Sequence, residues 1–79
     1  MKIEILGPGC TRCKETFRVV KHVVEQSGVD AEVVKEESYE RMMALGLLAT
    51  PGVAIDGKLV FSGRIPKADE VRQLLASVG

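Results

Sequence analysis

The chain contains no tryptophan, and aromatic residues make up only 4% of its 79 residues. Neither positive nor negative charge is in excess, because 11 Lys and Arg residues balance 11 Asp and Glu residues at a net charge of +0. Nucleic-acid binding depends on basic residues that neutralise phosphates and, for single strands, on aromatic side chains that stack with bases. The composition therefore argues against a nucleic-acid partner.

Long hydrophobic runs are missing as well. The most apolar stretch, residues 44–55, is interrupted by two glycines, a threonine and a proline. It falls short of the roughly 20 apolar residues that a helix needs to span a bilayer. Glu4 also lies where a secretory signal peptide would have its apolar segment. We therefore expect no membrane segment and a cytoplasmic protein.

Cysteine is scarce, since Cys10 and Cys13 are the only two in the sequence. Two cysteines are too few for the multiple bridges that stabilise small secreted domains. In a reducing compartment, a close pair more often serves redox or metal chemistry. These two residues are the candidates for the chemistry of the protein.

The pattern of apolar and turn residues predicts one α/β domain over residues 1–79 with the element order βαβαββα. Alternating or β-branched segments predict strands at residues 2–6, 29–34, 52–55 and 58–62. Apolar positions at helical spacing predict helices at residues 11–26, 39–47 and 69–78. Asp56-Gly57 suits the turn of a hairpin between the last two strands. We expect a parallel βαβ unit first and an antiparallel hairpin after it.

The two cysteines are three positions apart where a loop becomes a helix, so both thiols can lie on one helical face, close enough to form a disulfide. The helix dipole, together with Arg12 and Lys14, favours a thiolate there and can lower a cysteine pKa from about 8.5 to roughly 3.5–7.5. Cys10 precedes the helix, whereas Cys13 begins its apolar stripe. We predict a thiol–disulfide oxidoreductase in which Cys10 is the attacking thiolate and Cys13 the resolving thiol.

Metal binding is an alternative use of the same pair. Two thiolates form half of a zinc site or a complete two-coordinate site for a soft ion such as Cu(I). His22 is the only histidine, and on a helical wheel it lies nearly opposite the stripe that begins at Cys13. We expect no resident metal or cofactor, and a soft-metal carrier remains the alternative function. A disulfide that acts as a sensor in an interaction module also remains open.

Three short segments together form a pattern. They are Gly7-Pro8-Gly9-Cys10-Thr11-Arg12-Cys13 between the first strand and helix, Thr50-Pro51 before the hairpin, and Gly63 before the last helix. The pattern resembles the thioredoxin superfamily, in particular the small thioredoxin-like or glutaredoxin-like redox-active disulfide proteins of archaea and bacteria. The resemblance implies a minimal thioredoxin fold, with a four-stranded mixed sheet flanked by three helices.

The resemblance also implies a substrate-binding groove beside the cysteines. Pro51 is expected to follow a cis peptide bond and to leave the backbone of Thr50 available to an extended substrate segment. Gly63 is expected to keep the groove flat, and Thr11 and Arg12 are expected among the residues that contact substrate. Thr11-Arg12 differs from the Gly-Pro of thioredoxin, so the redox potential of the family is not carried over.

Glu4 lies six residues before Cys10, the separation at which thioredoxins have a buried carboxylate that assists proton transfer. If Glu4 is desolvated in a central strand, its pKa is raised and it can act as a general base near Cys13. If that face of the strand is open, Glu4 is solvated.

Disulfide-containing proteins are the implied substrates of a monomeric enzyme. The implied reductant is a flavoprotein similar to thioredoxin reductase, or glutathione. The segment Ser62-Gly63-Arg64-Ile65 lacks the Gly-Gly-Ser/Thr-Asp pattern with which glutaredoxins bind glutathione, so the choice of reductant stays open. Tyr39, Met42 and Met43 are expected to pack in the small core. Residues 35–37 are expected to form a solvated strand end.

Overall fold

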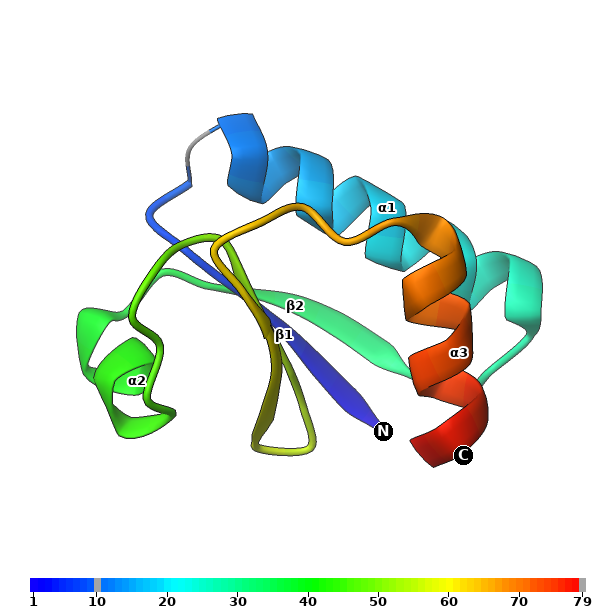
Figure 1. Cartoon of the computed structure of the whole chain (residues 1–79). Coiled ribbons are helices and arrows are strands. Elements are labelled where there is room, and N and C mark those ends of the chain that lie inside the picture. Colours follow the sequence, from blue (N-terminus) through cyan, green and yellow to red (C-terminus); the bar gives the residue numbers. More distant parts are fainter. Residues whose placement is uncertain (10, 79) are drawn as a thin grey trace.

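The fold is described from a computed structural model that covers residues 1–9 and 11–78. Its elements follow one another as β1 (Lys2–Leu6), α1 (Thr11–Ser27), β2 (Glu32–Glu36), α2 (Tyr39–Ala44), β3 (Gly52–Ile55), β4 (Lys58–Ser62) and α3 (Ala68–Val78) (Figure 1). This order confirms the predicted βαβαββα pattern. Cys10 and Gly79 lie outside the described residues.

The four strands form one mixed sheet in the order β2-β1-β3-β4. β1 pairs in parallel with β2, from Lys2 opposite Glu32 to Leu6 opposite Glu36, and antiparallel with β3. β3 and β4 form an antiparallel hairpin with an irregularity at Val53/Ala54. A parallel pair needs a crossover connection, which α1 supplies. β1 is therefore a central strand, as a front βαβ unit and a following hairpin require.

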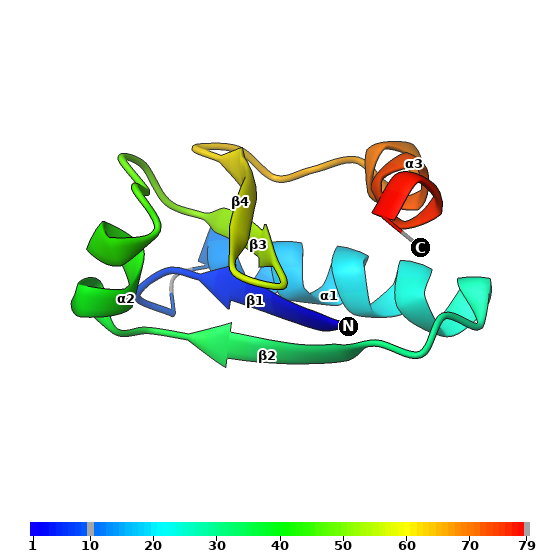
Figure 2. The same ribbon diagram turned by 90° about the horizontal axis from the view of Figure 1, so that it is seen from below.

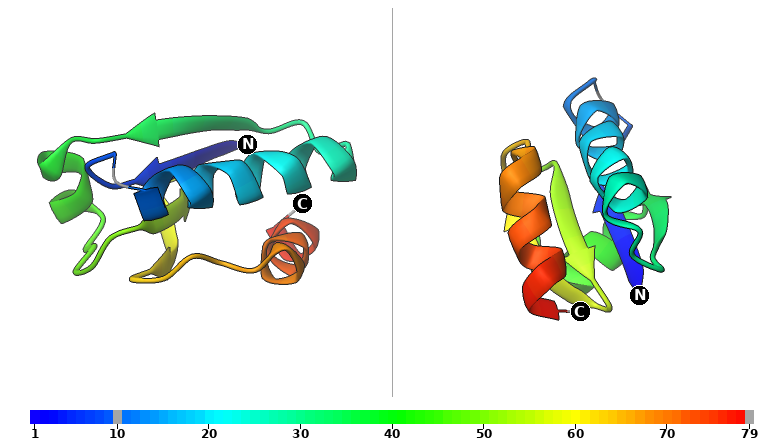
Figure 3. Two further views of the ribbon diagram at one scale, coloured as in Figure 1. Left: turned by 90° about the horizontal axis from the view of Figure 1, so that it is seen from above. Right: turned by 90° about the vertical axis from the view of Figure 1, so that its right-hand side faces the viewer.

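The two faces of the sheet carry different helices. α1 and α3 lie side by side on one face, while α2 lies near the end of β1 on the other (Figures 2 and 3). Side chains alternate along a strand, so Ile3 and Ile5 of β1 enter the larger core with α1 and α3. Leu6 enters the smaller core with Met42 of α2 and Ala54 of β3. Consecutive residues of β1 thus face different helices.

The second strand lies later in the sequence than predicted. The β-branched residues indicated 29–34, whereas the ladder with β1 runs over Glu32–Glu36. Each of these residues has a backbone partner in β1, and β2 is an edge strand on which charged side chains can reach water. The second helix is also shorter than predicted, because Leu45 is its C-cap and Leu47 lies beyond its end.

The prediction that Tyr39 and Met43 pack in the core is wrong. Met42 is buried against the sheet, but Tyr39 is 69% exposed and Met43 is 77% exposed. A helix of 6 residues offers a single narrow face to the sheet, and Met42 occupies it beside Leu6. Within the described ranges, no helix combines the length and apolar composition that crossing a membrane requires.

Candidate active site

Cys13 lies in the first turn of α1, where its side chain is only 6% exposed. Its sulfur occupies the space next to Gly7, at the end of β1. A Cβ atom on Gly7 would overlap the Cys13 sulfur and would lie 3.8 Å from the Cβ of Thr50. The absence of a side chain at Gly7 therefore allows Cys13 to approach β1 and the segment before β3.

The Thr50–Pro51 peptide bond is cis, which confirms the expectation for Pro51. Pro51 is buried and Thr50 is partly exposed. On either side of Thr50, the carbonyls of Ala49 and Pro51 both accept hydrogen bonds from the amide of Gly63, at 3.1 and 2.9 Å. Gly63 has a φ of 80°, and a Cβ there would lie 3.3 Å from that of Ala49. Gly63 is thus held directly against the cis-proline segment.

Arg12 connects α1 to this segment. Its guanidinium donates a hydrogen bond of 3.3 Å to the carbonyl of Gly63, 51 positions later in the sequence. The backbone carbonyl of Arg12 accepts a 2.8 Å bond from the hydroxyl of the buried Thr16. Thr11 begins α1 and is exposed.

The structure therefore brings together most of the residues that the sequence predicted for the site. Arg12 meets Gly63, Gly63 meets the cis-proline segment, and the Cys13 sulfur lies at Gly7 close to Thr50. Cys10, predicted as the attacking thiolate, lies outside the described residues.

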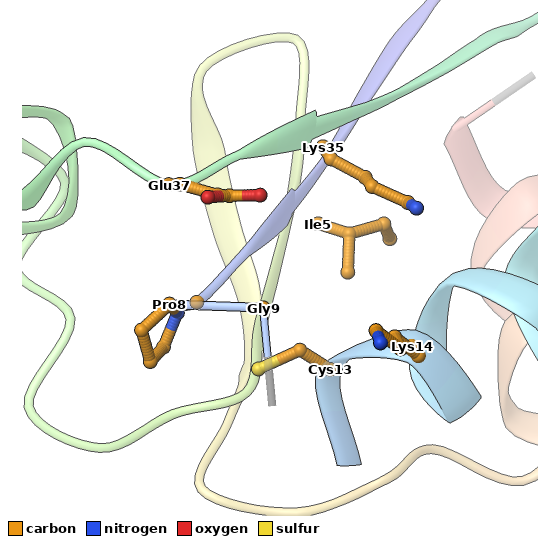
Figure 4. Close-up of a pocket in the computed structure, with 8 residues that line it drawn as sticks. Ile5, Pro8, Gly9, Cys13, Lys14, Lys35 and Glu37 are labelled. Atoms are coloured by element: carbon orange, nitrogen blue, oxygen red, sulfur yellow. The ribbon is translucent and has the colours of Figure 1, made fainter. Parts of the chain in front are cut away.

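A pocket of about 230 Å³ opens on the β2 side of Cys13. Its lining residues are Ile5, Gly7, Pro8, Gly9, Cys13, Lys14, Lys35 and Glu37. In Figure 4, the Cys13 sulfur points toward Pro8 and Gly9, while Lys35 and Glu37 extend over the pocket from the other wall. The Lys35 ammonium also lies 4.9 Å from the centre of the Phe17 ring of α1. Two ammonium groups and one carboxylate thus surround the space beside the sulfur.

Sequence reasoning missed Lys35 and Glu37 as residues of this site, because it treated residues 35–37 as a solvated strand end. Both side chains are exposed, but they line the Cys13 pocket. One signal could have located them: in a parallel pair, the carboxyl ends of the strands meet at the same edge of the sheet, where α/β proteins bind ligands. Lys35, near the end of β2, and Glu37, just after it, therefore lie beside the residues at the end of β1.

Glu4 is 3% exposed, so the solvated alternative is wrong. Both of its carboxylate oxygens accept hydrogen bonds from Arg41 of α2, at 2.8 and 3.0 Å. These bonds are the main reason that the pKa of Glu4 is lowered, and they outweigh the effect of desolvation, which would raise it. The expected raised pKa is therefore also wrong, because no pattern around Glu4 indicated that Arg41, 37 positions later, is its cationic partner.

Glu4 and Cys13 belong to different faces of the sheet. Glu4 contacts α2, whereas its neighbour Ile5 packs toward α1 and lines the pocket that contains Cys13. Within the described ranges, every buried side-chain nitrogen and oxygen has a hydrogen-bond partner. The carboxylate at Glu4 is thus a satisfied ionic group on the side of β1 that faces away from α1.

His22 is exposed on α1, in a depression that it shares with Phe17 and Lys21. It does not line the pocket beside Cys13. Across residues 1–9 and 11–78, no three His, Cys, Asp or Glu side chains come together in an arrangement that could hold a metal ion.

Comparison with known proteins gives consistent matches over almost the whole chain. The family model of the thioredoxin domain matches residues 1–76. A thioredoxin of Methanocaldococcus jannaschii is 43% identical over 75 residues, which cover 95% of this chain and 86% of the relative. A thioredoxin of Methanothermobacter thermautotrophicus is 36% identical over 76 residues, covering 96% of this chain and 99% of the relative.

Proposed function

Because the chain belongs to the thioredoxin family, it is a thiol–disulfide oxidoreductase, and we propose that it reduces protein disulfides through Cys10 and Cys13. The observation that carries this proposal is the position of Cys13. Its sulfur is buried in the first turn of α1, against Gly7 and close to Thr50. A resolving thiol needs such a place, beside the segment that holds the substrate and shielded from solvent.

The reaction consists of two thiol–disulfide exchanges. The Cys10 thiolate attacks one sulfur of the substrate disulfide, forming a mixed disulfide and releasing the other substrate sulfur as a thiolate. Cys13 then gives up its proton and attacks the Cys10 sulfur, which releases the second substrate thiolate. Two electrons have passed to the substrate, and the enzyme is left with a Cys10–Cys13 disulfide.

The start of α1 supports this division of roles. The positive end of a helix dipole favours a thiolate in the preceding residues, and the cationic side chains of Arg12 and Lys14 add to that effect. Cys13 is almost completely buried, so a protein disulfide cannot reach it first. Cys13 can therefore act only after Cys10 has brought the substrate sulfur to the site.

The cis-proline segment is the proposed binding site for the substrate chain. An extended segment pairs with the backbone of Thr50, while Pro51 packs beside the cysteines and Gly63 forms the adjoining surface. The hydrogen bonds from the Gly63 amide to the carbonyls on both sides of Thr50 support this role, because they hold the segment in place. Thr11 and Arg12 adjoin the same groove from α1.

The oxidised enzyme requires a reductant, and we propose a flavoprotein similar to thioredoxin reductase, with glutathione as the alternative. Both act in a reducing cytoplasm, where a pair of cysteines cycles between dithiol and disulfide. We propose that the enzyme works there as a monomer. Reduction of the oxidised protein by each donor, followed by thiol titration, distinguishes them, and size-exclusion chromatography checks the monomer.

Cysteine variants test the mechanism. With a protein disulfide as substrate, Cys13→Ser should accumulate a covalent enzyme–substrate adduct that dithiothreitol releases. Cys10→Ser should form no adduct. It should also show no turnover above that of the control, the double variant in which both Cys10 and Cys13 are replaced by serine. Turnover of Cys10→Ser above the double variant, or a substrate adduct on Cys13 in Cys10→Ser, would contradict the assigned roles.

A further inference from the structure

Arg12 differs from the other arginines of the chain in its partner. The guanidinium groups of four arginines pair with carboxylates: Arg18 with Glu15, Arg41 with Glu4, Arg64 with Glu70 and Arg72 with Asp69. Arg12 is exposed, and within the described ranges its side chain contacts a neutral group, the carbonyl of Gly63, at 3.3 Å. It has no carboxylate partner among the residues that the structure describes.

The position of Arg12 makes this difference relevant to substrate binding. The residue lies between the two cysteines in the sequence, and its side chain reaches the glycine that is hydrogen-bonded to both neighbours of Thr50. Its backbone is fixed by the bond from the Thr16 hydroxyl. The guanidinium therefore lies on the β4 side of Cys13, beside the groove proposed for the substrate chain.

A guanidinium has five N–H donors in a planar arrangement that matches a carboxylate. A single 3.3 Å bond to a carbonyl leaves most of these donors for an incoming group. We propose that Arg12 binds a carboxylate of the substrate, so that the enzyme prefers disulfide proteins with an aspartate or glutamate beside the reactive cysteine. This inference rests on the proposed function.

The other cations near the site are less suited to this role. Arg64, next to Gly63 in the sequence, is held by two bonds of 2.6 and 2.7 Å to Glu70. Lys14 and Lys35 line the pocket on the β2 side of Cys13, where Glu37 offsets part of their charge. Arg12 is thus the one guanidinium on the β4 side that a substrate carboxylate can pair with, among the described residues.

Matched peptide disulfides test the proposal. Three disulfide-linked peptides differ only in one residue beside the reactive cysteine, which is Glu, Gln or Lys. For each peptide, the rate of reduction by the enzyme is divided by the rate of its reduction by dithiothreitol alone, because a neighbouring charge also alters the intrinsic reactivity of a disulfide. At low ionic strength, the wild-type protein should prefer Glu over Gln by about threefold to tenfold in kcat/KM, with Lys the poorest.

Variants locate the preference. Arg12→Gln should reduce the Glu:Gln ratio to about one, and Arg12→Glu should reverse it in favour of Lys. Arg18→Gln is the matched control, since Arg18 is an exposed arginine of the same helix that pairs with Glu15. It should keep both the basal rate and the ratio. A fold defect alone would lower all three rates together and leave the ratio unchanged.

Two results would overturn the proposal. One is equal normalised rates for the three peptides with wild-type protein. The other is a Glu:Gln preference that survives Arg12→Gln. If that preference also disappears in Lys14→Gln, carboxylate binding lies in the pocket on the β2 side. Either result leaves the proposed function intact. Failure of the wild-type protein to reduce any of the peptides or a protein disulfide would instead contradict the proposed function.

Discussion

The carboxylate of Glu4 and the guanidinium of Arg41 form a two-point ion pair between the central strand β1 and helix α2. The Glu4 side chain is almost fully buried, and the Arg41 side chain is 41% exposed. The pair lies next to the small core of Leu6, Met42 and Ala54. It therefore attaches α2, a helix of 6 residues, to the sheet by charge as well as by packing.

Removal of Arg41 should be costly, because it leaves a buried carboxylate without its partner. Arg41→Met should lower the free energy of unfolding at neutral pH and raise the pKa of Glu4 above its ordinary value, because desolvation then acts on the carboxylate without the opposing bonds. Urea denaturation and an NMR titration of Glu4 measure the two effects. The control is Arg72→Met, which breaks an exposed pair and should cost less than about 1 kcal/mol. Equal losses in both variants would contradict the structural role of Arg41.

The same pair should stabilise the fold in a defined pH range. The pKa of folded Glu4 is lowered, so its contribution is fully present above the pKa of the unfolded chain, about 4.3. The contribution is lost as the pH falls through the lower pKa of the folded state. Glu4→Gln should therefore have a lower Tm than wild type at pH 7, and the difference should shrink at about pH 3. A constant difference at both pH values would show that ionisation of Glu4 is not involved.

Glu4 should have little direct influence on the chemistry. Its carboxylate is held ionised by Arg41 on the face of the sheet away from α1, so it is a weak base for the Cys13 proton. Glu4→Gln should leave the midpoint of the pH–rate profile for disulfide reduction where it is in wild type, even though the variant is less stable. A shifted midpoint would establish Glu4 as the proton carrier that the resemblance to thioredoxins first suggested.

Glu70 should stay ionised at pH values where an ordinary glutamate is already protonated. Its carboxylate accepts two bonds from Arg64 and one from the backbone amide of Lys67, and these bonds lower the pKa of Glu70 to about 2. An NMR titration of the Glu70 side chain should give a midpoint near that value, and Arg64→Gln should move the midpoint up toward the ordinary range. An unchanged midpoint in the variant would show that Arg64 is not the cause.

Gly7 should tolerate no side chain. A Cβ there would overlap the Cys13 sulfur, so Gly7→Ala should displace the thiol, lower stability by about 1–3 kcal/mol and slow the resolving step. Mixed disulfide should then accumulate in stopped reactions. Gly28→Ala is the control: its φ of 68° makes alanine unfavourable by about 1 kcal/mol, but a Cβ there meets no atom within 4 Å. Similar accumulation in both variants would contradict the contact between Gly7 and Cys13.

Much of the fold could be predicted because its signals are local. The apolar spacing from Cys13 along α1 and the Asp56-Gly57 turn each depend on a few neighbouring residues. The cis peptide bond before Pro51 was expected from the resemblance to the thioredoxin superfamily, not from local signals. The bounds of β2 were harder to predict from the sequence, because pairing with β1 extends the strand through residues whose charges are typical of a solvated strand end.

The rest of the site depends on contacts between residues far apart in the sequence. Glu4 meets Arg41 across 37 positions, and no pattern around either residue indicates the other. Arg12 meets Gly63 across 51 positions. The packing of Tyr39 and Met43 was mispredicted for a related reason. The apolar pattern predicts that a helix forms, but the position of α2 on the sheet decides which of its side chains is buried.

The most direct test of the central claim is to identify the bond that one turnover leaves in the wild-type protein. Reduced protein is mixed with excess substrate disulfide, quenched, alkylated, denatured and digested with trypsin, which cleaves after Arg12 and thereby separates the two cysteines. The account predicts that residues 3–12 and 13–14 are recovered as one disulfide-linked pair, with two substrate thiols released per protein. Recovery of both peptides alkylated, or of a stable substrate adduct on Cys10, would contradict it.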